Sequence, residues 1–385
     1  MAYKMKDDKK HYTAIPLIRT MMREDANYAV TLGMRKNGKS YSIKEFSVAI
    51  SLGINPISKL SILKPYEEGT VAPRLFYLRR WQEDLGAKDT TRYFGDVPVD
   101  DMLNDGLHHY IKSFGSEIWI CTGEEKTGKD IKEYHIGYAG DLNGAEHLKS
   151  QYFGKDLMIV IYEEFITNGI YIDGMNEPRE LLNLVSTVIR NDIEHPFIFL
   201  IGNTISQVCP YYRYFGLTNF HRQAQDTREV YHVKKLDGSI VNIVAENARQ
   251  RIGHDHQSKL FFGQAEDSIV NGAWETQEYP TLPAKYDDCK KLYTIFYKSM
   301  EFLFAMELLK CKEGLFIFIR PHTTDLRPKA IVITDSFNPS PRYSRWWPNN
   351  ALGAIYKDLY DNGKVCYSDN LTGTNFVQVM ANYKR

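Results

Sequence analysis

The stretch YAVTLGMRKNGKSYSIKEFSVAISLG, residues 28–53, decides the fold of the first half of the chain. It opens with an apolar, β-rich run at 28–33 and passes through a glycine-containing loop into a helical pattern. In that pattern Ile43, Phe46 and Ile50 share one helix face, and Gly53 is placed to end the helix at its C′ position. A strand, a loop and a helix in this order predict the first unit of an α/β domain.

Residues 33–40 of this stretch, GMRKNGKS, match the phosphate-binding pattern GxxxxGK[ST] at every fixed position. In that pattern backbone N–H groups face phosphate oxygens, the lysine reaches the β- and γ-phosphates, and the hydroxyl binds Mg²⁺. We therefore predict ATP and Mg²⁺ as cofactors, with Lys39 catalytic and Ser40 a metal ligand. The predicted nucleotide-binding residues are Gly33, Arg35, Lys36, Asn37, Gly38, Lys39, Ser40 and Tyr41. A chance glycine-rich turn is the alternative, and Arg35 and Lys36 could equally be solvated.

Further apolar runs predict more strands of the same sheet: RLFYLRR (74–80), IWICTG (118–123), LMIVIY (157–162) and FIFLIG (197–202). Several are apolar on both faces, which is typical of central strands in a mostly parallel sheet covered by helices. EPRELLNLVSTVIRN (177–191) predicts a helix that opens near Pro178. We expect a P-loop ATPase domain at 1–205, an aromatic linker at 206–226 and a smaller α+β domain at 227–385.

The expected second domain contains a hairpin at 228–246, with Asp237-Gly238 in its turn. The run KLYTIFYKSMEFLFAMELLK, residues 291–310, predicts a buried helix, and LFIFI (315–319) and AIVITD (330–335) predict strands. A nuclease would need several carboxylates converging at strand ends. The acids at suitable strand edges are Asp237, Glu246, Asp325 and Asp335, but their spacing does not distinguish them from ordinary loop acids.

Polar side chains follow two of the predicted strands. Glu163 and Glu164 end the run 157–162, and because side chains alternate along a strand they can serve different tasks. We predict that Glu163 binds Mg²⁺ and that Glu164 is the general base for the attacking water; a solvated acidic pair is the alternative. Asn203 follows 197–202 and either contacts the γ-phosphate or caps the strand. For Arg79-Arg80, at the end of 74–80, we favour solvated strand ends over contact with nucleotide or DNA.

Composition excludes some classes of protein. Lysine plus arginine equals aspartate plus glutamate at 48 each, so no global basic field drives nucleic-acid binding and any such contact is local. The five cysteines are odd in number and show no CxxC spacing, which predicts reduced thiols. No apolar run approaches the ~20 residues of a membrane span. We expect a protein of the cytoplasm without a membrane partner.

The order of these parts resembles the DNA-packaging (encapsidation) ATPases of small tailed phages, relatives of the ATPase of large terminase subunits. The shared parts are the P-loop, a strand ending in Arg-Arg, an aromatic-Glu-Glu-Phe sequence, a helix with Arg190 and a strand running into Gly-Asn, all within 28–220. The resemblance implies an additional-strand, catalytic-glutamate, RecA-like domain. A smaller RNase H-like domain would follow it, of a nuclease type that has usually lost its active site.

The resemblance also implies roles and partners. Arg190 matches an arginine finger that acts in trans on the neighbouring subunit's γ-phosphate, although an arginine at a helix C-terminus can simply complement the helix dipole. Glu163 departs from the family's usual aspartate. The implied assembly is a homo-oligomeric, pentameric ring at the capsid portal in the host cytoplasm, which moves double-stranded DNA by hydrolysing ATP. A structural packaging RNA is left open as a further partner.

Two other functions stay open at this point. One is a terminase-like enzyme whose C-terminal carboxylates still bind metal and cut DNA. The other is a nucleotide-binding assembly adaptor at the portal that does not act as a motor.

Overall fold

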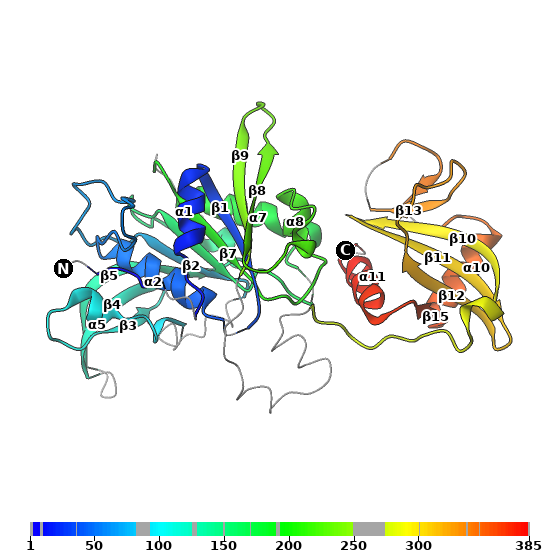
Figure 1. Cartoon of the computed structure of the whole chain (residues 1–385), viewed down its shortest axis with the longest axis horizontal. Coiled ribbons are helices and arrows are strands. Elements are labelled where there is room, and N and C mark those ends of the chain that lie inside the picture. The colour runs from blue at the N-terminus through cyan, green and yellow to red at the C-terminus, as the bar shows by residue number, and fades with distance from the viewer. Residues whose placement is uncertain are drawn as a thin grey trace. The chain divides into compact units, whose positions relative to one another are not determined.

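The chain forms two compact units in the computed structural model (Figure 1). The first comprises Met1–Thr167, Asn176–Ile205 and Cys209–Trp274, and the second comprises Asn168–Met175, Ser206–Val208 and Glu275–Arg385. The structure describes residues 3–7, 11–35, 37–81, 93–124, 129–148, 151–169, 171–189, 193–248, 274–299, 301–335, 338–345 and 347–383.

A nine-stranded sheet in the order β3-β4-β5-β2-β6-β7-β1-β9-β8 forms the centre of the first unit. The six central strands, β5-β2-β6-β7-β1-β9, pair in parallel. The antiparallel strands β3 and β4 extend one edge of the sheet, and the antiparallel strand β8 extends the other. This confirms the predicted mostly parallel sheet. The strands are β1 (Ala26–Leu32), β2 (Leu75–Arg79), β3 (Tyr110–Phe114), β4 (Glu117–Glu124), β5 (Lys129–Asp141), β6 (Ile159–Glu163), β7 (Phe197–Ile201), β8 (Thr227–Lys234) and β9 (Ile240–Asn247).

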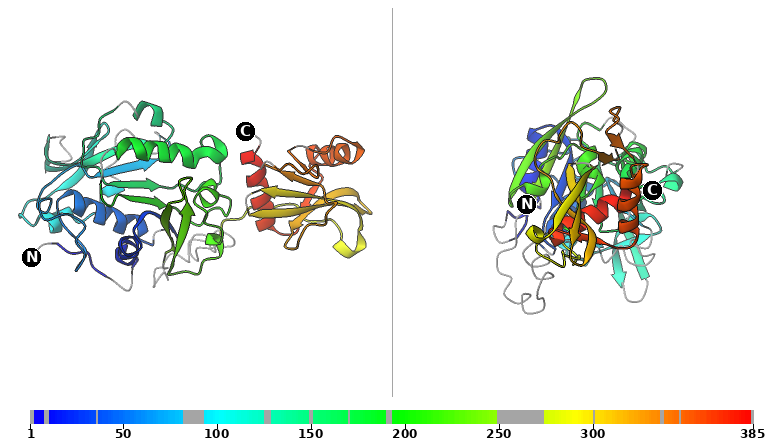
Figure 2. Two further views of the ribbon diagram at one scale, coloured as in Figure 1. Left: turned by 90° about the horizontal axis from the view of Figure 1, so that it is seen from above. Right: turned by 90° about the vertical axis from the view of Figure 1, so that its right-hand side faces the viewer.

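Helices lie on both sides of this sheet, with α2 on one side and α7 on the other (Figure 2, left). Helix α2 packs against β7, because Phe46 contacts Phe197 and Phe199 at ring-centroid distances of 5.5 and 6.1 Å. Gly53 follows this helix with φ +75°, as predicted for its C′ residue. The helices are α1 (Ile15–Arg23), α2 (Lys39–Ser51), α5 (Val99–Leu103), α6 (Ala145–Leu148), α7 (Glu177–Val188) and α8 (Pro210–Tyr214), with 3₁₀ turns at Gly174–Asn176 and Phe220–Arg222. Within the described residues, no helix combines the length and apolar character that a membrane crossing needs.

The observed division of the chain differs from the predicted one. Residues 209–226 are not a linker, because Tyr211, Tyr212, Phe215 and Phe220 are buried in the first unit. The hairpin β8–β9 forms as predicted, but β9 pairs in parallel with β1 and so belongs to the first sheet. Aromatic side chains bury a large apolar area, which explains how a segment broken by proline and glycine can still form core.

The second unit contains a six-stranded sheet in the order β14-β13-β10-β11-β12-β15. An antiparallel meander, β10-β11-β12, forms its centre, and β13 and β15 pair in parallel with β10 and β12. One face packs against two helices through Tyr356 and Phe376. The elements are β10 (Lys290–Ser299), β11 (Phe302–Cys311), β12 (Gly314–Pro321), β13 (Val332–Thr334), β14 (Tyr343–Ser344), β15 (Val365–Tyr367), α10 (Ala351–Asp361), α11 (Asn370–Tyr383) and a 3₁₀ turn at Tyr286–Asp288.

Two predictions for this unit are wrong. The buried helix predicted at 291–310 is instead the hairpin β10–β11, and no glycine or proline marks its reversal. A continuous apolar run fits a buried strand as well as a buried helix, so periodicity could not separate them. A disulfide joins Cys289 to Cys311, which corrects the expectation of reduced thiols at these positions. The hairpin register causes this, because it pairs Lys290 with Lys310 and so places the flanking cysteines opposite each other.

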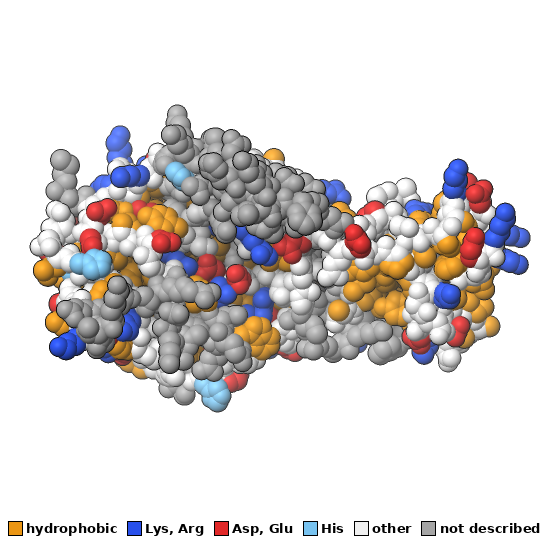
Figure 3. All heavy atoms as spheres, turned by 90° about the horizontal axis from the view of Figure 1, so that it is seen from below, with side chains coloured by type: hydrophobic (Ala, Val, Ile, Leu, Met, Phe, Trp, Pro, Cys, Tyr) orange, Lys and Arg blue, Asp and Glu red, His pale blue; other side chains and the backbone are white. Residues whose placement is uncertain are grey.

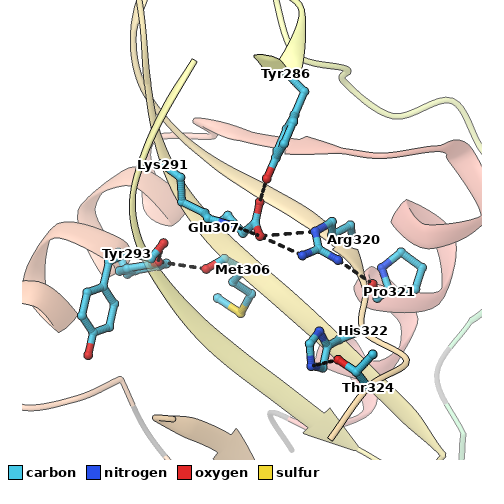
Figure 4. Close-up of polar contacts among 10 residues, drawn as sticks. Tyr286, Lys291, Tyr293, Met306, Glu307, Arg320, Pro321, His322 and Thr324 are labelled. Atoms are coloured by element: carbon cyan, nitrogen blue, oxygen red, sulfur yellow. Dashed lines mark hydrogen bonds and ion pairs between the residues drawn. The ribbon is translucent and has the colours of Figure 1, made fainter. Parts of the chain in front are cut away.

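A buried glutamate, Glu307, lies on the sheet face opposite α10 and α11 (Figure 4). It accepts hydrogen bonds from Tyr286 at 2.6 Å and Arg320 Nη2 at 2.9 Å, and Lys291 Nζ lies 3.3 Å away. Burial raises the pKa of Glu307, but these three partners outweigh it, so the pKa is lowered overall. Glu307 is therefore ionised at neutral pH, and its charge stabilises this face of the sheet.

We expect Glu307→Gln to destabilise the second unit by roughly 1–2 kcal/mol at neutral pH. The variant loses charge-assisted hydrogen bonds, but Arg320 and Lys291 are partly exposed and stay solvated. The effect shrinks as the pH falls below the ordinary glutamate value of about 4.3, where the wild type itself loses this contribution. Hydrogen exchange of β11 and β12 amides in the full chain measures it. The control is Asp361→Asn, which removes the exposed pair with Lys357 and should change stability by less than about 1 kcal/mol. Equal exchange in both variants would contradict the prediction.

Candidate nucleotide-binding site

The loop between β1 and α2 needs both of its glycines. A Cβ atom on Gly33 would lie 2.9 Å from Asn37 Nδ2 and 3.0 Å from Ala248 Cβ. Gly38 has φ +98°, a conformation that side chains other than glycine's rarely adopt. Asn37 is buried and accepts a hydrogen bond from the Lys39 N–H at 3.1 Å. The pattern residues therefore fix the path of the loop into α2.

Lys39 is buried inside this loop. Its Nζ donates to the carbonyl oxygens of Gly33 and Met34, at 3.2 and 2.9 Å, and to Asn203 Oδ1 at 2.8 Å. Burial lowers the pKa of Lys39 to about 7, although the carboxylate of Glu163 opposes the shift. The structure thus brings the predicted lysine, which begins α2, into direct contact with Asn203, which follows β7, the strand beside β1.

Glu163 ends β6 and is also buried. Lys44 Nζ lies 2.9 Å from its Oε2, and the Tyr77 hydroxyl donates to the same oxygen. Burial raises the pKa of Glu163, but Lys44 and the hydrogen bonds of Ser40 and Tyr77 outweigh it and lower the pKa to about 2. The two predicted metal ligands, Ser40 and Glu163, are therefore in contact, and the carboxylate is ionised at neutral pH.

Glu164 has an unusual backbone conformation, with φ +59°. Left-handed conformations in residues other than glycine are strained and occur often at functional sites. Its N–H donates to the Ile201 carbonyl at 2.8 Å, and its Oε2 accepts from Arg79 Nη2 at 2.6 Å. The Glu164 side chain is 56% exposed, so a substrate in solution can reach it. To accept a proton from water, however, the carboxylate must leave Arg79.

Arg79 ends β2 and Arg80 follows it, and both are buried, which corrects our interpretation of them as solvated strand ends. Arg79 binds Glu164, and Arg80 forms an ion pair with the buried Glu177 at 3.1 Å. These carboxylates follow their arginines by 85 and 97 residues. No local sequence pattern therefore indicates that Arg79 or Arg80 has a carboxylate partner.

A cavity of about 400 Å³ adjoins the loop and the start of α2. Its lining residues are Tyr3, Lys6, His11, Tyr12, Asn37, Gly38, Tyr41, Ser42, Glu45, Pro98 and Asp101. Volumes of roughly 300–1,000 Å³ are typical of small-molecule sites. The aromatic lining and the contact with the loop make this cavity a suitable place for a planar base.

These features fit ATP and Mg²⁺. Mg²⁺ prefers oxygen ligands, and the contacting hydroxyl of Ser40 and carboxylate of Glu163 supply them. The start of α2 and the Lys39 ammonium suit phosphate. Among the other predicted residues, Tyr41 lines the cavity and Arg35 is exposed beside the loop. Lys36 and Arg190 lie outside the described residues.

Sequence reasoning missed several residues of the site. Lys44 follows Ser40 by one helical turn, so the i, i+4 rule could have found it. Its Nζ also lies 5.2 Å from the centre of the Tyr77 ring and 5.5 Å from that of Phe94, an arrangement that stabilises a buried cation. The contacts of Tyr77 and Arg79 could not be predicted, because their partners, Glu163 and Glu164, are 86 and 85 residues away in the sequence.

The four acids considered as candidates for a nuclease site do not share one unit. Asp237 and Glu246 lie in the β8–β9 hairpin of the first unit, whereas Asp325 and Asp335 lie in the second. Glu246 is buried and accepts a hydrogen bond from Tyr12 at 2.6 Å. Asp335 accepts one from Ser299 at 2.6 Å.

Comparisons with known proteins agree with this architecture. No protein-family model matches the chain, and no curated protein does either. Among solved structures, the gp11 DNA packaging motor of Phi-28 has a TM-score of 0.50 at 16% identity, covering 97% of this chain and 98% of that one. The genome packaging motor assembly of bacteriophage Phi-29 has a TM-score of 0.50 at 19% identity, covering 97% and 100%. The N-terminal domain of the phi29 DNA packaging ATPase has a TM-score of 0.43 at 22% identity, covering 62% and 97%. Over nearly its whole length, the chain therefore has the fold of the phage DNA-packaging motor proteins.

Proposed function

We propose that this chain is an ATP-driven motor that translocates double-stranded viral DNA into a preformed capsid. The convergence of Lys39, Glu163 and Asn203 at one edge of the parallel sheet, beside Ser40 and Glu164, carries the proposal. Two solved structures that match nearly the whole chain are named as DNA or genome packaging motors. Their names support the proposal that ATP hydrolysis at this site drives DNA packaging.

Each residue of the site has a task in this proposal. The N–H groups of residues 37–40 and the Lys39 ammonium bind the phosphates, with Asn203 beside the γ-phosphate. Ser40 and Glu163 hold Mg²⁺, which neutralises phosphate charge when bound. Glu164 leaves Arg79 and orients the attacking water as general base. The cavity beside Tyr12 and Tyr41 takes the adenine base.

The motor works as a homo-oligomeric, pentameric ring at the capsid portal of the infected host cell. Double-stranded DNA is held in the ring lumen by its phosphates, without readout of sequence. Acidic and basic side chains are interspersed on the face shown in Figure 3, and the chain has no net charge. The proposed basic surface is therefore local and lies on another face, which is turned to the lumen. A structural packaging RNA is a candidate partner at the portal.

Arg190 acts in this ring as a finger on the neighbouring subunit's γ-phosphate. Fingers of this kind raise the rate by about 10³–10⁵-fold. We therefore expect Arg190→Ala and Glu164→Gln chains each to be nearly inactive alone, because one lacks the finger and the other the base. Mixed together, they should regain part of the activity, since some sites combine an intact Glu164 with an intact Arg190 from the neighbour. The ATPase rate across mixing ratios measures this, and no recovery at any ratio would contradict action in trans.

The second unit is proposed to be an RNase H-like domain without nuclease activity. Its central strand β10 contains no acidic residue, and Glu307 on β11 is bound by Tyr286, Arg320 and Lys291. A terminase-like active nuclease is the competing proposal. Incubating the full chain with plasmid DNA and Mg²⁺ or Mn²⁺ separates the two, because only an active nuclease cuts the plasmid.

A DNA packaging assay tests the main proposal directly. Procapsids, genomic DNA, ATP and the purified chain are combined, and DNA protected from added nuclease is measured. ATP-dependent protection supports the motor. ATP binding without turnover or protection would instead support a nucleotide-binding assembly adaptor at the portal.

A further inference from the structure

Two consecutive arginines hold opposite ends of one residue. Arg79 binds the carboxylate of Glu164, whereas Arg80 Nη1 donates to the Glu164 carbonyl oxygen at 3.2 Å. Arg80 Nη2 also donates to the Phe165 carbonyl oxygen at 2.5 Å. Arg79 thus contacts the carboxylate of Glu164, and Arg80 contacts the backbone that carries it.

The Arg80 guanidinium also contacts a buried carboxylate, that of Glu177. Its Nε lies 3.3 and 3.2 Å from the two carboxylate oxygens of Glu177, and its Nη2 lies 3.1 Å from Oε1. The hydroxyls of Tyr162 and Tyr211 each donate to the same Oε1 at 3.0 Å. All four side chains are buried, and Glu177 is fully so. They come from β6, α7, α8 and the end of β2, so the cluster joins four separate elements.

This arrangement explains how the Glu164 backbone stays left-handed. A strained conformation persists only where the surroundings over-determine it. The guanidinium group is planar with donors in a fixed fork, so holding it on the Glu177 side sets the direction of its donors toward residues 164–165. A lysine ammonium in the same place could not make both sets of contacts.

We propose that Arg80 and Glu177 form a positioning pair that fixes the backbone of Glu164 and so aims its carboxylate. The proposal rests on the proposed function, in which Glu164 is the general base. Arg80 contacts the backbone of Glu164 and Phe165, and Glu177 contacts Arg80, so we infer that both act through Glu164. Loss of the pair should therefore affect turnover and spare nucleotide binding.

Arg80→Lys is the first test, made in the full chain. We expect kcat for ATP to fall by about 100-fold, because a displacement of about 1 Å costs that much in rate. The Kd for a fluorescent ATP analogue should stay near the wild-type value, and circular dichroism checks the fold. Parallel losses of binding and kcat, or an unchanged kcat in a folded variant, would overturn the proposal.

A double-mutant cycle tests whether Arg80 acts through Glu164. In the Glu164→Gln background there is no base left to aim, so Arg80→Lys should lower the residual rate no further. A general structural role would lower that residual rate by the same factor as it lowers the wild-type rate. Independent, multiplying effects would therefore overturn the proposal.

Tyr211→Phe is a milder variant in case Arg80→Lys fails to fold. It removes one hydrogen bond to Glu177, and we expect a several-fold lower kcat with unchanged Kd. Tyr110→Phe is the matched control, because it removes a 2.7 Å bond to Asp130 far along the sheet. Equal rates in both variants would count against the pair. A wild type without any ATP turnover in this assay would instead contradict the proposed function, so the two failures can be told apart.

Discussion

Glu164→Gln should lower kcat for ATP hydrolysis by about 10²–10⁴-fold, the usual contribution of a general base. The amide has nearly the same shape as the carboxylate but cannot accept the proton of the attacking water. ATP should still bind, because Lys39 and Ser40 stay in place. Single-turnover hydrolysis and the Kd of an ATP analogue measure the two effects separately.

Glu194→Gln is the matched control for this variant. Glu194 is also an exposed glutamate with an ion pair, 3.2 Å from Lys64, but it precedes β7 and so lies at the opposite end of the parallel strands. We expect wild-type turnover from it. A Glu164→Gln chain that hydrolyses ATP at the control's rate would show that Glu164 is not the base.

Lys39→Ala should lower ATP hydrolysis by a similarly large factor, but it should weaken nucleotide binding as well. Removing the ammonium takes away the charge that stabilises the transferring phosphoryl group, so kcat/KM should fall by at least about 10²-fold. The weaker nucleotide binding distinguishes this variant from Glu164→Gln. Isothermal titration calorimetry with a nonhydrolysable ATP analogue measures the binding loss.

Lys112→Ala controls for the removal of a partly buried, paired lysine, since Lys112 lies 2.7 Å from Asp130 in the same unit. It should bind nucleotide as the wild type does. Unchanged ATP binding and hydrolysis in Lys39→Ala would contradict the assignment of residues 33–40 as the phosphate-binding loop.

Local patterns predicted the parts of the fold that local chemistry determines. The structure confirms the loop with Gly33 and Gly38, the strand before it, the helix after it and the helix near Pro178. Asn203 was predicted either to contact the γ-phosphate or to cap its strand; the structure shows it in contact with Lys39, because parallel strands end at the same edge of a sheet.

Long-range partners could not be predicted in this way. Arg79 and Arg80 look like ordinary charged strand ends, and only the fold shows that Glu164 and Glu177 neutralise them. The continuation of the first unit beyond residue 205 was also not predicted, because it depends on long-range strand pairing. Its sheet continues through β9, whose pairing with β1 joins residues about 200 positions apart in the chain.

ATP hydrolysis by the purified chain, with and without double-stranded DNA and procapsids, tests the central claim most directly. A packaging motor couples turnover to DNA, so we predict that DNA and procapsids together raise the rate well above that of the chain alone. The Glu164→Gln chain should show no such rise. A wild-type rate that is unchanged by DNA and procapsids, or that Glu164→Gln matches, would contradict the account.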